Sequence, residues 1–284
     1  MKKEIINHVS DTAYLIAFYR MLEAKKKNSI VKDLLSFLLI NDRAERICKK
    51  IKNKNHFDWL VPLRTNSIDF LISKYIKERN IDTVINLGAG LDTRAYRLDG
   101  LEKIKWFDID FSNVIEYKSN LLKNVLPKCI LQYIKLDLSL REERKKILSE
   151  ICTQANNVLV LSEGLILYLK EIEVLFLSED LLKHKNINYW IQDYYSKDYF
   201  KFSLISSKRS FKNSPFQFFP KNIFEFYAEI GWKNNEIISC INEGKKLKKS
   251  SPFPVNLYEN FYSIIDSKKL DNFCGVTILS RLIN

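Results

Sequence analysis

The chain has 284 residues, 46% of them hydrophobic, and a formal net charge of +12. This length can bury one large core, or a core with a cap, and no apolar run is long enough to span a bilayer. Five scattered cysteines and three distant histidines make a disulfide framework or a metal site a poor fit, so we expect no metal and a cytoplasmic protein with free thiols.

Helical spacing dominates the first 80 residues. Within residues 11–52, apolar side chains recur three or four positions apart, which predicts helices. Pro62 indicates a break over residues 57–63, and residues 67–78 again show the pattern of an amphipathic helix. We therefore expect residues 1–80 to form an N-terminal helical cap.

From Thr83 onward, strand and helix patterns alternate. The predicted strands are 83–87, 104–108, 130–135, 157–161 and 187–193, and the predicted helices are 93–97, 112–124, 140–151 and 171–183. Such alternation is typical of a parallel sheet with helices on both faces, joined by right-handed crossovers. Ligands of such sheets bind outside the carboxyl ends of the strands.

The alternation stops at residues 194–222, which are rich in Tyr and Phe. This segment is either a lid that excludes water from a site or ordinary core packing. Residues 222–230 then predict a helix, and residues 235–240 and 273–279 predict strands that pair antiparallel at the sheet edge. The whole chain is expected to be one domain with its core in 81–193 and 223–284.

A glycine turn directly follows the first predicted strand. Gly88-Ala89-Gly90 and the polar Asp92 and Thr93 form the strand–turn–helix opening of a nucleotide-binding βαβ unit. A pyrophosphate binder would carry Gly or Ala at position 93, and Asp92 would compete with a phosphate for the N–H groups of the helix start. A ligand without phosphates, such as S-adenosylmethionine, fits this turn better than a dinucleotide.

Two acids end the second predicted strand. Asp108 and Asp110 lie about 20 residues past the glycines, where this architecture places a ribose-binding carboxylate. An ionised carboxylate can accept hydrogen bonds from both hydroxyls of a ribose diol. Either acid can serve by this argument.

Several further motifs occur in a fixed order along the chain: 87–94 (LGAGLDTR), 96–98 (YRL), 108–111 (DIDF), 136–138 (LDL) and 161–169 (LSEGLILYL). In these motifs the chain resembles the leucine carboxyl methyltransferase family, which includes bacterial O-methyltransferases of polyketide pathways. The resemblance implies a class I methyltransferase fold: a mostly parallel Rossmann-like sheet with an antiparallel edge, N-terminal helices and a lid insertion. It also implies S-adenosyl-L-methionine as cofactor. One departure is Lys32-Asp33-Leu34-Leu35, where bacterial members usually carry Asp-Pro.

The resemblance also implies roles for single residues. Arg64 would hold the methionine carboxylate of the cofactor, and Gly88, with Gly90 in the same turn, would lie under it. Asp110 would bind the ribose, with Asp108 as the alternative. The remaining assignments are adenine contacts for Asp137 and Leu138, and a position near the methionine amino end for Glu163.

Tyr168 is the candidate catalytic residue, since its hydroxyl could donate a hydrogen bond to the acceptor oxygen. Packing against neighbouring leucines is its alternative role. Arg94 and Arg97 flank the glycine turn and are expected to form ion pairs, because a permanent cation would repel a sulfonium.

The leading hypothesis is methyl transfer to a carboxylate, or a hydroxyl, of a small metabolite or short acidic chain. A carboxylate is already ionised at neutral pH and needs no general base, whereas a phenol with a pKa near 10 does. The alternatives are a nicotinamide-dependent oxidoreductase, which Thr93 disfavours, and a basic nucleic-acid-binding protein without catalysis. The basic run at residues 245–249 is disfavoured as a nucleic-acid site because it has no interleaved aromatic residues. The sequence does not determine the oligomeric state.

Overall fold

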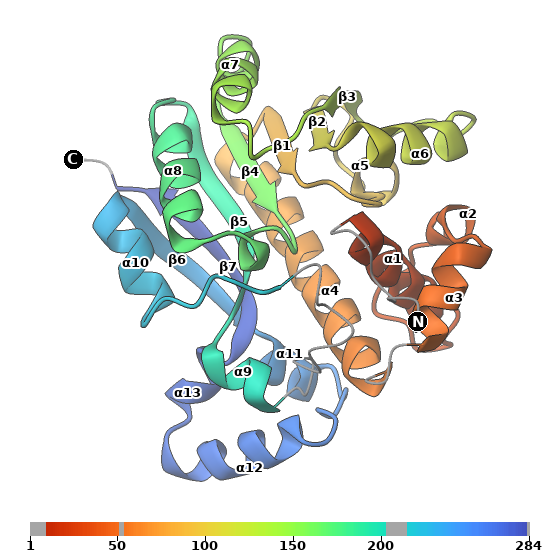
Figure 1. Cartoon of the computed structure of the whole chain (residues 1–284), viewed down its shortest axis with the longest axis vertical. Coiled ribbons are helices and arrows are strands. Elements are labelled where there is room, and N and C mark those ends of the chain that lie inside the picture. The colour runs from red at the N-terminus through yellow and green to blue at the C-terminus, as the bar shows by residue number, and fades with distance from the viewer. Residues whose placement is uncertain (1–9, 51–53, 203–214, 283–284) are drawn as a thin grey trace, which may run out of the picture. The chain divides into compact units, whose positions relative to one another are not determined.

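Two compact units make up the chain. The computed structural model describes residues 10–50, 54–202 and 215–282 (Figure 1). The first unit comprises residues 1–67, 194–216 and 237–276, and the second comprises residues 68–193, 217–236 and 277–284. The second unit contains the glycine turn and the acids that follow the first strands.

Within the described residues, seven strands form one sheet in the order β3-β2-β1-β4-β5-β7-β6. They are β1 (Thr83–Leu87), β2 (Lys105–Asp110), β3 (Ile130–Lys135), β4 (Val158–Ser162), β5 (Ile187–Tyr195), β6 (Trp232–Ser239) and β7 (Cys274–Arg281). The pairs β1–β2, β1–β4, β2–β3 and β4–β5 are parallel, with Leu87 opposite Ile109 and Asn86 opposite Leu161. The α/β fold with a mostly parallel sheet is therefore confirmed. β1 and β4 are mostly apolar and every one of their residues is buried, as expected of strands that are covered on both faces.

The edge of the sheet is antiparallel, as expected. The Arg281 side chain at the end of β7 donates to the carbonyl of Ile187 at the start of β5, at 3.4 Å. At the other end, the Ser196 amide just after β5 donates to the carbonyl of Phe273 just before β7, at 2.9 Å. β5 and β7 therefore run in opposite directions. The expected pair is β6 with β7, which are neighbours in the sheet, and there Thr277 donates to the carbonyl of Glu236 at 3.1 Å and Ser280 to the side chain of Asn235 at 2.9 Å, so this pair is antiparallel too.

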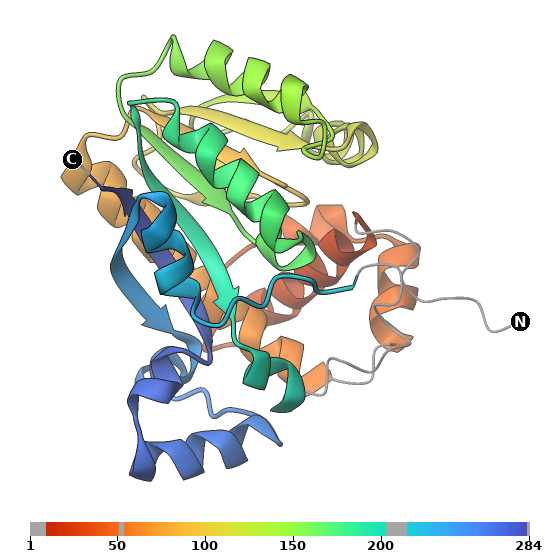
Figure 2. The same ribbon diagram turned by 60° about the vertical axis from the view of Figure 1, so that its left-hand side comes forward.

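Helices of the second unit cover both faces of its strands. They are α5 (Arg94–Arg97), α6 (Ser112–Leu122), α7 (Arg141–Cys152), the 3₁₀ helix η1 (Ile166–Tyr168), α8 (Glu171–Leu182) and α10 (Ile223–Ile230). On one face, α7, α8 and α10 bury apolar side chains in a core with Trp190 and Trp232. Figure 2 shows α8 and α10 side by side. Asn222 caps α10 by accepting from the amide of Phe224 at 3.1 Å, and Gly231 ends the helix in the left-handed region.

The first unit is helical, with α1 (Ser10–Ala24), α2 (Ser36–Leu39), α3 (Asp42–Lys50), α9 (Lys197–Phe202), α11 (Cys240–Lys246), α12 (Val255–Ile265) and α13 (Lys268–Asp271). The long helix α4 (Lys54–Arg79) contributes residues 54–67 to this unit and the rest to the second. None of the helices among the described residues is long and apolar enough to cross a lipid bilayer.

The expected break at residues 57–63 is wrong, because α4 runs through Pro62 without interruption. A proline inside a helix costs about 3 kcal/mol. The neighbouring side chains Trp59, Leu60, Val61 and Leu63 are all buried, and their burial offsets that cost. Tertiary packing thus overrides the local signal.

The aromatic segment 194–222 lies only partly within the described residues, because residues 203–214 fall outside them. In the first unit, Tyr199 and Phe200 are buried, and the rings of Phe200 and Phe216 lie 4.8 Å apart. In the second unit, Phe218 belongs to the core. Core packing therefore accounts for Phe218, and a lid formed by the segment stays a prediction.

Candidate functional site

The sequence motifs of the second unit gather at one edge of its parallel strands. Gly88 and Gly90 follow β1, Asp110 ends β2, Asp137 and Leu138 follow β3, and Glu163 follows β4. Because β3, β2, β1 and β4 are parallel neighbours, their carboxyl ends share this edge. The structure thus brings together six of the eight candidate residues. Tyr168 lies further along in η1, and Arg64 belongs to the other unit.

The glycine turn is a tight bend that only small residues permit. Gly88 has φ 66° and Gly90 has φ 49°, a region that L side chains rarely adopt. The amides of Gly88 and Ala89 both donate to the carbonyl of Ile109, at 2.9 and 3.1 Å. A Cβ at Gly88 would lie 3.3 Å from Cδ1 of Leu165. The turn after β1 is therefore in close contact with the loop after β4.

Asp110 is partly buried beside this turn. Its carboxylate accepts from the Gly90 amide at 2.6 Å and from the Phe111 amide at 2.7 Å, one on each oxygen. Burial raises the pKa of Asp110 above its ordinary value, and the two amide donors oppose that shift. A carboxylate offers about four acceptor sites, so Asp110 has capacity for further donors.

The carboxylate of Asp108, two residues earlier, is buried, and both of its oxygens already accept hydrogen bonds. One of its oxygens accepts from Asn86 and from Trp106, both at 2.9 Å, and the other accepts from Lys118 at 2.8 Å. The carboxylate is 1% exposed, and the ammonium of Lys118 is fully buried. The sequence left both acids open as ribose ligands, whereas their surroundings differ sharply.

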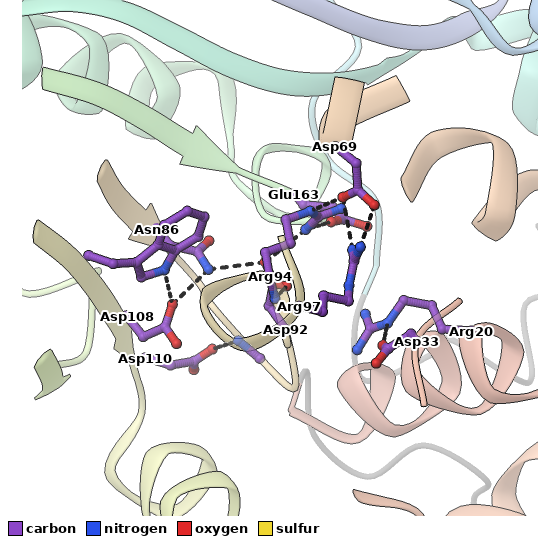
Figure 3. A network of polar contacts seen from close by, with 12 residues as sticks. Arg20, Asp33, Asp69, Asn86, Asp92, Arg94, Arg97, Asp108, Asp110 and Glu163 are labelled. Carbon is purple, nitrogen blue, oxygen red and sulfur yellow. Dashed lines mark hydrogen bonds and ion pairs between the residues drawn. The ribbon is translucent and has the colours of Figure 1, made fainter. Parts of the chain in front are cut away.

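Arg94, the first residue of α5, is the centre of a buried ion-pair network (Figure 3). Its Nε donates to Asp69 of α4 at 2.6 Å, and its Nη1 donates to Asp92 at 2.7 Å and to Glu163 at 2.6 Å. Burial alone would lower the pKa of Arg94, but the three carboxylates outweigh it and raise the pKa well above its ordinary value. Arg97 also pairs with Asp69. The expectation of ion pairs at both arginines is confirmed.

Asp92 connects this network to that of Asp108. Besides Arg94 Nη1, it accepts from the Arg94 amide at 2.8 Å and from the side chain of Asn86 at 3.2 Å. Asn86 in turn donates to Asp108. The carboxylate thus occupies an N–H at the start of α5, which is the position that a phosphate would need.

Asp137 and Leu138, which follow β3 at the same edge, are both partly buried. One Asp137 oxygen accepts from the Ser139 amide at 2.9 Å and from the Ser139 hydroxyl at 2.7 Å. The Leu138 carbonyl accepts from Arg144, which is also paired with Asp180 at 2.7 Å. The loop after β3 is therefore held from α7, while Leu138 keeps a partly buried apolar side chain.

In the first unit, Arg64 is 5% exposed and its Nη1 donates to the hydroxyl of Tyr195 at 2.9 Å. Tyr195 packs against Tyr199, whose hydroxyl lies 2.6 Å from Nε2 of His56. Burial lowers the pKa of His56 to about 3, so this histidine is a neutral packing residue. The departure at Asp33 also has a structural partner, since Arg20 donates to Asp33 at 2.8 Å.

Members of the second unit's network that were missed at the sequence level include Asp69, Asn86 and Lys118. Asp69 and Lys118 lie on helices where charged residues are common, so nothing singles them out. Asn86 did carry a signal, because it is an amide within the otherwise apolar β1. A buried polar group needs hydrogen-bond partners, and Asn86 finds them in Asp92 and Asp108.

Comparison with known families and proteins agrees with the resemblance in the sequence. The family described as "Leucine carboxyl methyltransferase" matches residues 13–180, which is more than half of the chain. The chain is 26% identical over 174 residues to a protein of Streptomyces avermitilis named "Putative S-adenosyl-L-methionine-dependent methyltransferase", covering 56% of this chain and 59% of that protein. It is 32% identical over 62 residues to the tetracenomycin polyketide synthesis O-methyltransferase TcmP of Streptomyces glaucescens, covering 22% and 23% of the two chains.

Among solved structures, a DUF574 family protein of Streptomyces avermitilis has a similar fold. Its TM-score is 0.60 at 12% identity, covering 93% of this chain and 96% of the other. At this identity the likeness concerns the fold alone. In sequence, the chain spans 59% of the length of the Streptomyces avermitilis relative and less of TcmP.

Proposed function

Because the chain belongs to the leucine carboxyl methyltransferase family, we propose that it is an S-adenosyl-L-methionine-dependent O-methyltransferase. Its acceptor is a carboxylate, or a hydroxyl, of a small metabolite or a short acidic chain. The relatives named above support the cofactor, and the polyketide O-methyltransferase supports an oxygen acceptor. The five buried free cysteines suit the cytoplasm as its location.

The observation that carries the proposal is the contrast between Asp110 and Asp108. Asp110 is partly exposed and keeps acceptor capacity next to the glycine turn, whereas Asp108 is 1% exposed and already accepts from three donors inside the protein. Asp110 is therefore the residue that would accept from the ribose hydroxyls. Asp108 would instead hold Asn86 and Lys118 behind it.

The glycine turn also fits this cofactor. A side chain at Gly88 would crowd Leu165, and its absence lets the backbone approach a ligand closely. Asp92 already occupies the amide of Arg94 at the start of α5, which disfavours a pyrophosphate there. Asp137 and Leu138 would contact the adenine, Glu163 would hold the methionine amino end, and Arg64 the methionine carboxylate.

When bound, S-adenosylmethionine supplies an electrophilic methyl group on a sulfonium. The task of the chain is then to align an acceptor oxygen with that methyl and to exclude water. A carboxylate acceptor needs no general base, because its pKa is about 4. Tyr168 is proposed to donate a hydrogen bond to the acceptor and to orient it. The aromatic segment 194–222 is proposed as the lid of a single catalytic domain that residues 1–80 cap.

Ligand binding tests the proposal. The protein is heated with S-adenosylhomocysteine, with NADH or with an oligonucleotide, each at about a hundred times an estimated dissociation constant, where a bound ligand adds about 2.7 kcal/mol. We expect stabilisation by S-adenosylhomocysteine alone. Stabilisation by NADH alone would assign an oxidoreductase, and stabilisation by the oligonucleotide alone a nucleic-acid binder.

The acceptor is then sought by incubating methyl-labelled cofactor with panels of carboxylic acids and phenols. A methyl ester, which mild base hydrolyses, is the expected product, and its rate of formation should be flat across neutral pH. A stable methyl ether on a phenol, with a rate that climbs about tenfold per pH unit, would contradict the base-free mechanism.

A further inference from the structure

The ion-pair network of Arg94 joins elements that are far apart in sequence. Asp69 lies on α4, Asp92 follows the glycine turn, and Glu163 begins the loop after β4. The Arg94 side chain is 1% exposed, and all three carboxylates are nearly buried, at 10–16% exposed. Arg94 therefore ties the loops after β1 and β4, which are adjacent strands, to one helix.

Two nitrogens of the Arg94 guanidinium, Nε and Nη1, bond to different partners. Nε is held by Asp69, which Arg97 holds in turn through both of its oxygens. Nη1 is thereby aimed at Asp92 and at Glu163. The planar fork fixes two directions at once, which an ammonium cannot do.

A structural role alone does not explain this arrangement well. Burying an ion pair costs desolvation free energy that its attraction barely repays, so such networks are weak evidence for stability. The network instead fixes a Glu side chain, which otherwise has several rotatable bonds, at the carboxyl edge of the sheet. Preorganised groups of this kind are what a binding site requires.

We propose that Arg94 is the positioning residue for the amino-acid end of the cofactor, acting through Glu163. This inference depends on the proposed function, because it takes the cofactor to be S-adenosylmethionine. Arg94 itself does not touch the ligand. It holds the side chain of Glu163 in a single orientation, in which the carboxylate faces the methionine ammonium.

The proposal has a signature that a purely structural role lacks. S-adenosylhomocysteine carries the amino-acid portion, and 5′-methylthioadenosine has the same adenosine and sulfur without it. Loss of the Arg94 guanidinium should therefore weaken the binding of S-adenosylhomocysteine and leave the binding of 5′-methylthioadenosine unchanged. A general loosening of the site would weaken both.

The test compares Arg94→Lys with wild type by calorimetric titration of both ligands. We expect the dissociation constant of S-adenosylhomocysteine to rise about tenfold, in line with the loss of a single charge-assisted contact, and that of 5′-methylthioadenosine to change by less than about threefold. The matched control is Arg281→Lys, an arginine of the same unit that donates to the backbone carbonyls of Leu182 and His184 instead. It should leave the ratio of the two constants unchanged.

Equal weakening of both ligands, or of neither, by Arg94→Lys would overturn the proposal. Should Arg94→Lys fail to fold, Asp69→Asn gives the same readout, because it removes the charge that holds Nε of Arg94 and leaves Glu163 itself unchanged. Failure of wild-type protein to bind S-adenosylhomocysteine would refute the proposed function itself, which separates the two conclusions.

Discussion

The two ends of the parallel strands use polar residues in different ways. At the amino ends, charged side chains bond to uncharged groups: Asp82 accepts from the amides of Asn156 and Asn157 and from the side chains of Thr83 and Asn156, and Arg281 donates to carbonyls before β5. At the carboxyl ends, charged side chains bond to one another, as in the pair of Lys118 with Asp108 and in the network of Arg94.

The polar residues at the two ends therefore have different roles: those at the amino ends hold loops together, and those at the carboxyl ends hold charged side chains in position for a ligand. At the amino ends, bonds from charged side chains to uncharged groups connect neighbouring loops. At the carboxyl ends, buried charges are held by other buried charges, and Asp110 alone among the acids of β2 keeps room for a ligand. Substitutions at the two ends should therefore fail in different ways.

The largest effect is expected from Asp108→Ala. It leaves the buried ammonium of Lys118 without its carboxylate, and breaking a buried pair in this way costs about 3–5 kcal/mol. Urea unfolding measures the loss. Asp82→Ala at the amino end is the control and should cost only about 1 kcal/mol, because water can replace the lost acceptor. Equal losses at the two ends would contradict the comparison.

Asp110→Ala should act on binding and not on stability. Removing a carboxylate that accepts two ribose hydroxyls costs about 3 kcal/mol, or roughly two orders of magnitude in the dissociation constant of S-adenosylhomocysteine. Because burial already disfavours the ionised form of Asp110, the free energy of unfolding should hardly fall. Calorimetry and urea unfolding on the same protein give both quantities. An unchanged dissociation constant would remove Asp110 from the site.

The same contrast can be drawn in the first unit between Arg64 and Arg20. Arg64→Ala should weaken the binding of S-adenosylhomocysteine by about 1.5–3 kcal/mol, which is the free energy of a charge-assisted contact to a carboxylate. Arg20→Ala removes a cation of similar burial that is paired with Asp33, so it should lower stability and leave the dissociation constant unchanged. If both variants bind normally, Arg64 has no cofactor role.

The strands of the sheet were predictable because their signal is local. β1 and β3 match the expected residues 83–87 and 130–135, and the other parallel strands differ only at their ends. Continuous apolar runs between turn residues leave little choice for a buried strand. The course of α4 through Pro62 was not predictable, because burial of side chains around the proline decides it.

The candidate site was predictable only where residues adjoin the glycine turn or a strand end. The choice between Asp108 and Asp110 was not, because it depends on Asn86 and Lys118, which lie 22 and 10 residues from Asp108 along the chain. Likewise, the ion pairs of Arg94 could be expected in kind, but their partners Asp69 and Glu163 are 25 and 69 residues away. Contacts at such separations follow from the fold and not from the local sequence.

The smallest and most discriminating effect concerns pH. Burial raises the pKa of Asp110, so its folded form holds a proton at pH values where the unfolded chain has lost it. Its contribution to stability therefore falls as the pH rises through the window just above the ordinary aspartate pKa of about 3.9. Burial would also raise the pKa of Asp82, but hydrogen bonds from Asn156, Thr83 and Asn157 lower it overall. Its contribution is present above about 3.9 and is lost as the pH falls through the lower folded value.

The two isosteric variants should therefore diverge in opposite directions. Relative to wild type, Asp110→Asn should gain stability as the pH rises through its window above about 3.9, whereas Asp82→Asn should lose stability as the pH rises toward about 3.9 from below. Urea unfolding at a series of pH values on both sides of this point measures each difference. S-adenosylhomocysteine binding to wild type should weaken as the pH falls through the Asp110 window, because the ribose needs the ionised acceptor. If stability changed with pH in the same way for both variants, the pKa of Asp110 would be lowered by its hydrogen bonds, as that of Asp82 is. Asp110 would then not be a carboxylate that is available to a ligand.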